Sequence, residues 1–218
     1  DAFPLVLTRG RGEKTTVAWD GKEGSVVSHV KTGNGALRWS QDGRFLCGRG
    51  EGSSSEVKIF EVQRKKPKGG IEPVFDKLPS KHAMTLISKV KVADIAFRDA
   101  PQADKAVTSG MDGSLQIWNL NVEYKFNENP NLLCSTKLPQ KAVDMAFGAE
   151  GTRLAVATED SALHVFTYSP LPEPSLHEDF VIENIHPEGV AAIQFCPSGK
   201  AVYSRGRAHK EVHAWSVE

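Results

Sequence analysis

Arginine stands next to glycine at three widely separated places in the chain, a combination that suits the binding of anions. The three segments are Arg9-Gly10-Arg11-Gly12, Arg49-Gly50-Glu51-Gly52 and Arg205-Gly206-Arg207. A guanidinium donates two parallel hydrogen bonds to a phosphate or carboxylate, and glycine lets the backbone approach closely. The pattern predicts a surface for anions or for an acidic partner, provided that the fold brings the segments together. A solvated rim of charged residues is the alternative.

Other arrangements of reactive side chains give little support for catalysis. The Gly-Arg-Gly tripeptides lack the third glycine of a dinucleotide-binding fingerprint and do not open a helix. His209 and His213 are four residues apart, which on a strand separates them by roughly 13 Å and argues against a shared metal ion. His186, close to Glu188, is expected to make a hydrogen bond within a loop. We therefore expect a protein that is not an enzyme and that has no cofactor and no metal.

The bulk composition is that of an ordinary globular domain. The chain has 218 residues with 27 basic and 27 acidic side chains, so the net charge gives no hint of nucleic acid. No apolar run approaches the ~18 residues of a membrane helix. Cys47, Cys134 and Cys196 are far apart and form no Cys-x-x-Cys pair, which indicates reduced thiols in a protein that faces the cytosol. The first residue is Asp1, not methionine, and we expect a longer polypeptide.

A five-fold recurrence predicts the fold. Five tripeptides each close a short β-like run, and their aromatic residues are 41, 58, 48 and 49 positions apart. The tripeptides are Ala18-Trp19-Asp20, Ile59-Phe60-Glu61, Ile117-Trp118-Asn119, Val165-Phe166-Thr167 and Ala214-Trp215-Ser216. A period of roughly 40 to 45 residues with a Trp-Asp-like ending is the signature of the blades of a WD40 β-propeller. The predicted fold class is therefore all-β, and residues 1–218 form a single propeller domain.

Each blade of a propeller has four strands, a to d, and the aromatic tripeptide ends strand c. The third blade, for example, is predicted at 92–97, 105–109, 114–118 and 132–136. The whole chain gives 18 such strands, with strand a missing from the first blade and strand d from the last. This amounts to about 4.5 blades of an expected seven-bladed ring with ~28 strands, so N-terminal blades are absent. Such an arc exposes apolar end faces.

Seven residues of the blade pattern are expected to have a structural role. They are the aromatics Trp19, Phe60, Trp118, Phe166 and Trp215 and the turn residues Asp112 and Asp160.

The propeller pattern places the Arg-Gly segments together. They fall in turns between strands b and c, which share one face, here called the top face, with the loops that lead from strand d into the next strand a. The predicted binding residues of this face are Arg9, Arg11, Lys31, Arg49, Lys89, Lys91, Lys141, Arg205 and Arg207. A protein partner, acidic or phosphorylated, is the first hypothesis. RNA is the alternative, although the interleaved aromatic residues that would stack bases are missing.

Three long insertions between strands c and d are expected on the opposite, bottom face. They cover residues 63–81, 122–131 and 168–177, and they are rich in proline, glycine and lysine. Such composition is typical of surface loops without regular structure.

Several stretches resemble the transducin beta-like 2 family. They are Asn121-Val122-Glu123-Tyr124-Lys125 with Asn129-Pro130-Asn131-Leu132-Leu133, Ser40-Gln41-Asp42-Gly43-Arg44-Phe45 before Val57-Lys58-Ile59-Phe60-Glu61-Val62, and His186-Pro187-Glu188-Gly189. The likeness covers essentially the whole chain, as the C-terminal part of that family's propeller. It implies a scaffold facing the cytosol at the endoplasmic reticulum, held by an N-terminal membrane helix that is not in this chain. The guanine-nucleotide-exchange propeller of export from the endoplasmic reticulum is the alternative, although the chain shows no matching potassium-binding loop.

The chain departs from a strong WD40 pattern in its polar residues. The Gly-His pair that normally precedes strand a is replaced by Ser88-Lys89 and Pro139-Gln140, and is only approached by Ile185-His186. The Asp-His-Ser/Thr-Trp hydrogen-bond set of a blade is thus incomplete everywhere. We infer that apolar packing, more than buried polar networks, holds the blades together.

Overall fold

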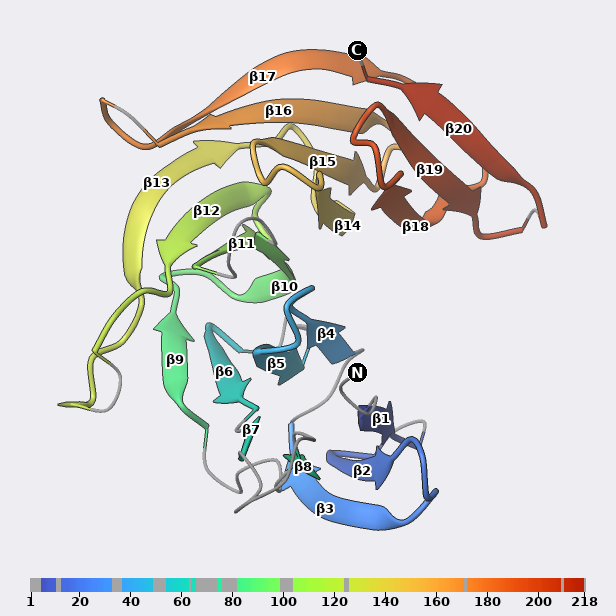
Figure 1. The fold of residues 1–218 in the computed structure, drawn as a ribbon. Helices are drawn as coiled ribbons and strands as arrows, with labels where there is room; N and C mark the ends of the chain where they lie inside the picture. The colour runs from blue at the N-terminus through green and yellow to red at the C-terminus, as the bar shows by residue number, and fades with distance from the viewer. Residues whose placement is uncertain are drawn as a thin grey trace.

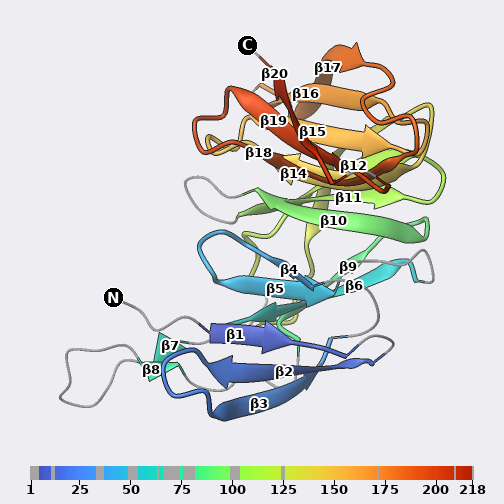
Figure 2. The ribbon, with the colours of Figure 1, turned by 90° about the vertical axis from the view of Figure 1, so that its right-hand side faces the viewer.

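Five β-sheets of three or four strands stand side by side in an arc in the computed structural model (Figure 1). The structure describes residues 5–10, 13–32, 37–48, 54–62, 64–65, 74–75, 82–98, 104–123, 126–170, 172–208 and 210–217. In each of the later four sheets, the first strand lies on the concave side of the arc. Neighbouring sheets are stacked face to face along the arc (Figure 2). Arg11 and Arg49, two of the predicted binding residues, lie outside the described residues.

The sheets follow one another in sequence order, and all strand pairs in them are antiparallel. The first contains β1 (Leu5–Thr8), β2 (Thr15–Asp20) and β3 (Val26–Lys31). The second contains β4 (Leu37–Trp39), β5 (Phe45–Gly48), β6 (Glu56–Glu61) and β9 (Met84–Ile87). The third contains β10 (Val92–Arg98), β11 (Lys105–Gly110), β12 (Ser114–Asn119) and β13 (Asn131–Lys137). The fourth contains β14 (Ala142–Phe147), β15 (Arg153–Thr158), β16 (Leu163–Ser169) and β17 (Ser175–Ile182). The last contains β18 (Val190–Phe195), β19 (Ala201–Gly206) and β20 (Val212–Ser216).

This arrangement confirms the predicted all-β propeller and the order of its strands. The first sheet lacks strand a and the last lacks strand d among the described residues, as the sequence predicts. Two features of the loops differ from the prediction. The 63–81 insertion contains a short hairpin of β7 (Arg64–Lys65) and β8 (Val74–Phe75).

The other difference is the predicted 168–177 loop, half of which is strand. Tyr168 pairs with Leu176 and Thr167 pairs with His177, so β16 and β17 run on to a tight connection. The reason is that Tyr168 is 2% exposed and its N–H donates to the carbonyl of Thr152. The three prolines restrict only the connection itself, at Pro170, Pro172 and Pro174.

Apolar cores fill the four junctions between neighbouring sheets. In each junction the marked aromatic of one sheet faces the sheet before it: Phe60 packs with Ala18, Trp118 with Ile59, and Phe166 with Ile117. These three aromatics are between 2% and 4% exposed. Because a blade cannot bury its faces alone, these cores supply most of the cohesion between sheets.

Partial hydrogen-bond sets add to the apolar cores. In the last sheet Trp215 Nε1 donates to Ser204 Oγ at 2.7 Å, and Ser204 Oγ lies 2.8 Å from His186 Nε2. His186 is 1% exposed, and its partner lies on β19, not within the loop as the sequence predicts. Trp118 Nε1 donates to Thr108 Oγ1 at 2.8 Å in the third sheet. Asp112 and Asp160 have the predicted turn roles: Ser114 N donates to Asp112, and Thr158 Oγ1 donates to Asp160.

The two ends of the arc present open sheet faces. On the first sheet Trp19 has the position of Phe60 and Trp118, and it shares its face with Val6 and Val26, which are 46% and 47% exposed. On the last sheet the open face carries Tyr203, 43% exposed, and Val212, 62% exposed. The predicted exposure of apolar residues at the end faces therefore holds for the described residues.

Candidate functional site on the top face

Along the described top face of the last three sheets, turns and loops alternate in a rim and are joined by backbone hydrogen bonds. The N–H of Met111 donates to the carbonyl of Lys91, and the N–H of Leu138 donates to the carbonyl of Gly113, both at 2.8 Å. The next links join Glu159 to Lys141, Ile185 to Ser161 and Arg207 to Gly189 at 2.9 to 3.0 Å. Gly113 has a φ of +83°, and a Cβ atom there would lie 2.8 Å from the carbonyl oxygen of Leu138. Side chains on this rim are therefore presented on a fixed backbone.

The structure brings most of the predicted cations to this rim. Lys31 ends β3, Lys89 and Lys91 lie between β9 and β10, and Lys141 lies just before β14. Lys31, Lys89 and Lys91 are exposed, and none of them forms an ion pair among the described residues. Lys141 instead pairs with Glu159, the residue to which its carbonyl is bonded. Arg9 follows β1 in the turn of the first sheet and is half-buried.

Two of the predicted residues, Arg205 and Arg207, have different surroundings. Arg207 is exposed in the turn, and its Nε donates to the carbonyl of Val190 at 3.2 Å. Arg205 belongs to β19, not to the turn. Its neighbours Ser204 and Gly206 are buried while Arg205 and Tyr203 are exposed, so alternation places Arg205 on the open face of the last sheet, close to the rim.

The carboxylates of the top face are more often engaged than its lysines. Asp112 accepts hydrogen bonds from the hydroxyl and the N–H of Ser114, which lower the pKa of the Asp112 carboxyl. Asp160 accepts from Thr158, and Glu159 pairs with Lys141. Other exposed acids of this face, such as Glu188, dilute the positive charge. The rim therefore offers free ammonium groups between carboxylates that are partly neutralised.

Sequence reasoning missed several contributors to this face. Further exposed cations of the rim are Lys14, Lys137 and Lys210. Met111 is 45% exposed directly beside the lysine pair of residues 89 and 91, and it supplies an apolar contact there. The turn signal Asp112-Gly113 could have indicated Met111, because the residue before a tight turn at a blade rim faces solvent.

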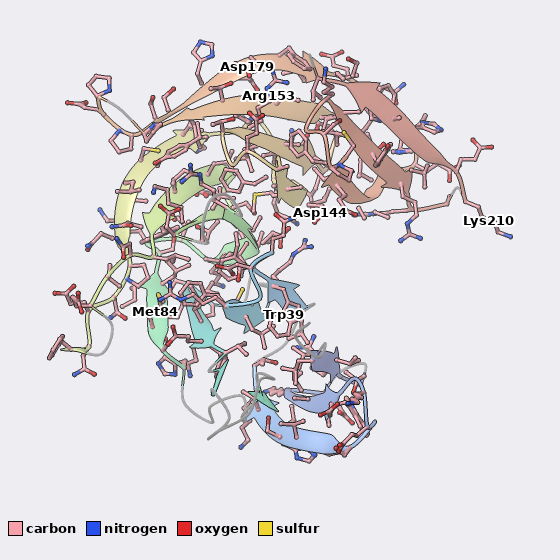
Figure 3. All side chains as sticks on the ribbon, viewed as in Figure 1. Trp39, Met84, Asp144, Arg153, Asp179 and Lys210 are labelled. Atoms are coloured by element: carbon pink, nitrogen blue, oxygen red, sulfur yellow. The ribbon has the colours of Figure 1, made fainter. Side chains whose placement is uncertain are left out.

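The concave side of the arc holds a second polar cluster that the sequence did not reveal. Nη2 of Arg38 on β4 donates to Asp94 Oδ2 on β10 at 3.1 Å and to Asp144 Oδ1 on β14. Asp144 Oδ2 also accepts from the N–H of Ile193 on β18 at 2.8 Å. Burial disfavours the charge of Arg38, but the carboxylates outweigh it and raise the pKa of the guanidinium. Asp144 lies on the concave side and Asp179 on the convex side (Figure 3).

An open cavity of about 670 Å³ adjoins this cluster, with Arg38 and Asp144 in its wall beside Trp39, Phe147 and Tyr203. Both carboxylates already accept hydrogen bonds from the protein, so the cluster acts as a link between four sheets.

Among the described residues no group of three or more His, Cys, Asp or Glu side chains is placed to hold a metal ion. The described part of the chain also contains no helix long and apolar enough to cross a bilayer.

The fold is that of WD40 β-propellers. A chain in a crystal structure of the mitotic checkpoint complex matches 98% of this chain with a TM-score of 0.72 and 15% sequence identity. The C-terminal WD40 domain of Sif2 matches 98% with a TM-score of 0.59 and 13% identity. The matched regions are 61% and 66% of those two chains, so the present chain spans less than two thirds of their lengths. No family model and no curated protein matches the sequence.

Proposed function

We propose that this WD40 propeller is a non-enzymatic interaction scaffold that binds an acidic or phosphorylated protein segment on its top face. The observation that carries the proposal is the set of exposed lysines, Lys31, Lys89 and Lys91, which lack ion-pair partners among the described residues. A segment with carboxylates or phosphates would gain charge-assisted hydrogen bonds there.

The hydrogen-bonded rim supports this proposal on energetic grounds. Side chains on a fixed backbone lose less conformational entropy on binding than those on a mobile loop. Met111, next to Lys91, adds an apolar contact to a surface that would otherwise bind only by charge. A partner with an apolar residue beside an acidic one fits this combination.

Peptide binding tests the proposal. Acidic, phosphorylated and basic peptides of equal length are compared for affinity to the protein at two salt concentrations. The double variant Lys89→Glu/Lys91→Glu is compared with a matched control, Lys22→Glu/Lys58→Glu, which reverses two exposed lysines elsewhere. Acidic or phosphorylated peptides are expected to bind, and only the first variant is expected to lose them. Equal affinity of both variants would exclude the top face as the binding site.

The same variants separate proteins from RNA as ligands. RNA binding would fall steeply with salt because bound counterions are released. Strongly exposed aromatic side chains suited to base stacking are scarce in the described residues: Phe126 lies between β12 and β13, and Tyr203 lies on an open sheet face. RNA retained on a filter with a steep salt dependence, and lost in the Lys89→Glu/Lys91→Glu variant, would replace the protein-segment proposal.

A location at the endoplasmic reticulum and a relation to transducin beta-like 2 remain proposals carried by the sequence resemblance alone. The alternative relation, to the exchange propeller of export from the same organelle, is likewise proposed from the sequence alone. Fractionation of cells that express the full-length protein tests the location: recovery with endoplasmic reticulum membranes supports it, and recovery only in the soluble fraction contradicts it.

A further inference from the structure

The bottom face carries a small basic notch between the last two sheets, on the side opposite the top face. It is a cavity of about 210 Å³ between the turn after β14 and the turn after β18. Its polar lining comes from Glu150, Thr152, Arg153, Ser198 and Lys200, and Gly199 forms part of its wall. Figure 3 marks Arg153, which starts β15.

The two turns have the same backbone geometry, so the notch has a firm frame. Gly151 and Gly199 occupy the same place in them, with φ of 65° and 72°. In each turn the N–H before the turn bonds to the strand that follows: Gly148 to Arg153, and Cys196 to Ala201, both at about 2.9 Å or less. Arg98 Nε from the preceding sheet donates to the carbonyl of Gly151 at 2.7 Å. These bonds fix the shape of each turn.

A hydrogen bond positions one donor of the notch, Arg153. Nη1 of Arg153 donates to the carbonyl of Val217, which is 1% exposed. That bond fixes the plane of the guanidinium at the wall of the notch. Thr152 and Ser198 are exposed and add hydroxyl groups, and Lys200 adds a second positive charge. Guanidinium, ammonium and hydroxyl groups together are the donors that recognise phosphate and carboxylate oxygens.

The equivalent turn of the second sheet carries an acid where the last turn carries Ser198. In that turn Asp42 Oδ1 accepts from Ser40 Oγ at 2.6 Å and from the N–H of Arg44 at 2.9 Å, so a carboxylate closes the turn. Ser198 takes the place of Asp42 in the last turn, and its hydroxyl lies 3.0 Å from Cys196 Sγ. A neutral group thus replaces an acid, and of the charged residues in the notch only Glu150 is negative.

We propose that this notch binds an oxyanion, a phosphate or carboxylate group, between Arg153 and Lys200. Its volume of about 210 Å³ holds such a group with part of the chain that carries it. The site lies on the bottom face and does not depend on the top-face proposal. Glu150 opposes the anion, so its charge weakens the site while that of Lys200 strengthens it.

The opposite effects of these two charges give the test. The amide signals of Gly151 and Gly199 are followed by NMR while inorganic phosphate, or acetate in a second arm, replaces chloride at constant ionic strength. Saturable shifts are expected. Lys200→Gln is expected to weaken phosphate binding roughly three- to tenfold and Glu150→Gln to strengthen it roughly two- to threefold. The matched control Lys58→Gln, an exposed side chain on β6, is expected to change nothing.

Each outcome decides a specific point. Saturation with phosphate but not acetate assigns a phosphate site, and saturation with both assigns a general oxyanion site. Shifts that do not saturate, or that respond equally to Lys200→Gln and Lys58→Gln, would overturn the proposal. The top-face variant Lys89→Glu/Lys91→Glu should leave the shifts intact, so the two proposals can fail separately. Dispersion of the remaining signals shows that each variant is folded.

Discussion

Arg38 and Asp144 are 106 residues apart in the sequence, yet Nη2 of Arg38 donates to the Asp144 carboxylate across the concave side of the arc. The same nitrogen reaches Asp94, whose side chain is fully buried, while the Arg38 side chain is 27% exposed. The pair therefore ties the second sheet to the fourth across the third. No other ion pair among the described residues spans so many sheets.

Removal of this guanidinium should destabilise the protein strongly. Arg38→Met leaves Asp94 and Asp144 buried without their counterion, and an uncompensated buried charge typically costs about 3–5 kcal/mol. Because Arg38 is partly exposed, we expect about 2–4 kcal/mol, measured as the free energy of unfolding in urea. Arg44→Met is the control: its partner Glu61 is near the surface and its own side chain is 45% exposed, so a loss of about 0–1 kcal/mol is expected. Similar losses for both variants would contradict the linking role.

The positions of the marked aromatics could be predicted from the sequence because they repeat. Their unequal burial could not, since burial depends on whether a sheet precedes them. Trp19 and Trp118 have the same place in their sheets, but Trp118 is 4% exposed and lies between two sheets, whereas Trp19 is on the open face with Val6. The same motif residue therefore contributes differently to the free energy of unfolding in the two sheets.

This difference predicts the cost of two equivalent substitutions. Trp118→Ala should cost about 3–5 kcal/mol because it empties a buried site and leaves Thr108 without its donor. Trp19→Ala should cost less than half of that, although Trp19 also donates to Thr8. Urea unfolding of both variants is the measurement. An equal cost for Trp19 would mean that another sheet or another copy of the chain covers the open face in solution.

The hydrogen bonds between residues far apart in the sequence could not be predicted, for a physical reason. Asp94 and Asp144 have the same place in a repeated strand, but nothing in the sequence pairs them with Arg38. Their contact with Arg38 follows from the curvature of the arc, which is a property of all the junctions together. The 168–177 segment was predicted as a loop because of its prolines, but the buried ring of Tyr168 extends the strand. By contrast, the turn roles of Asp112 and Asp160 are local, and the sequence predicted them correctly.

The stability of the protein should depend on one hydroxyl group in the buried hydrogen-bond set of the last sheet. Ser204→Ala removes the partner of both His186 Nε2 and Trp215 Nε1. A buried donor or acceptor without a partner costs about 1–3 kcal/mol, so the unfolding free energy should fall by about that amount. Ser216→Ala, an exposed serine on the neighbouring strand, is the control and should change stability by less than about 0.5 kcal/mol. A neutral Ser204→Ala variant would show that water replaces the hydroxyl.

Cys196 and Cys47 should differ in reactivity, because their surroundings differ. The hydroxyl of Ser198 lies 3.0 Å from the Cys196 sulfur. This hydrogen bond, with help from the N–H of Ala201 and against the opposing effect of burial, lowers the pKa of Cys196 to about 7. Burial raises the pKa of Cys47, which is 0% exposed. Alkylation by iodoacetamide requires the thiolate. The alkylation rate at Cys196, followed by mass spectrometry, should therefore rise with pH around a midpoint near 7, while Cys47 stays unmodified in the folded protein.

The lowered pKa of Cys196 also has a consequence for stability with a definite sign. The folded state favours the thiolate, so its contribution is present above the usual thiol pKa and is lost as pH falls through about 7. Ser198→Ala should move the alkylation midpoint upward toward the usual value of roughly 8.5, because the thiolate loses its strongest donor. Thr152→Ala, in the neighbouring turn, should leave the midpoint unchanged. A midpoint near 8.5 in the unmodified protein would show that Ser198 does not stabilise the thiolate.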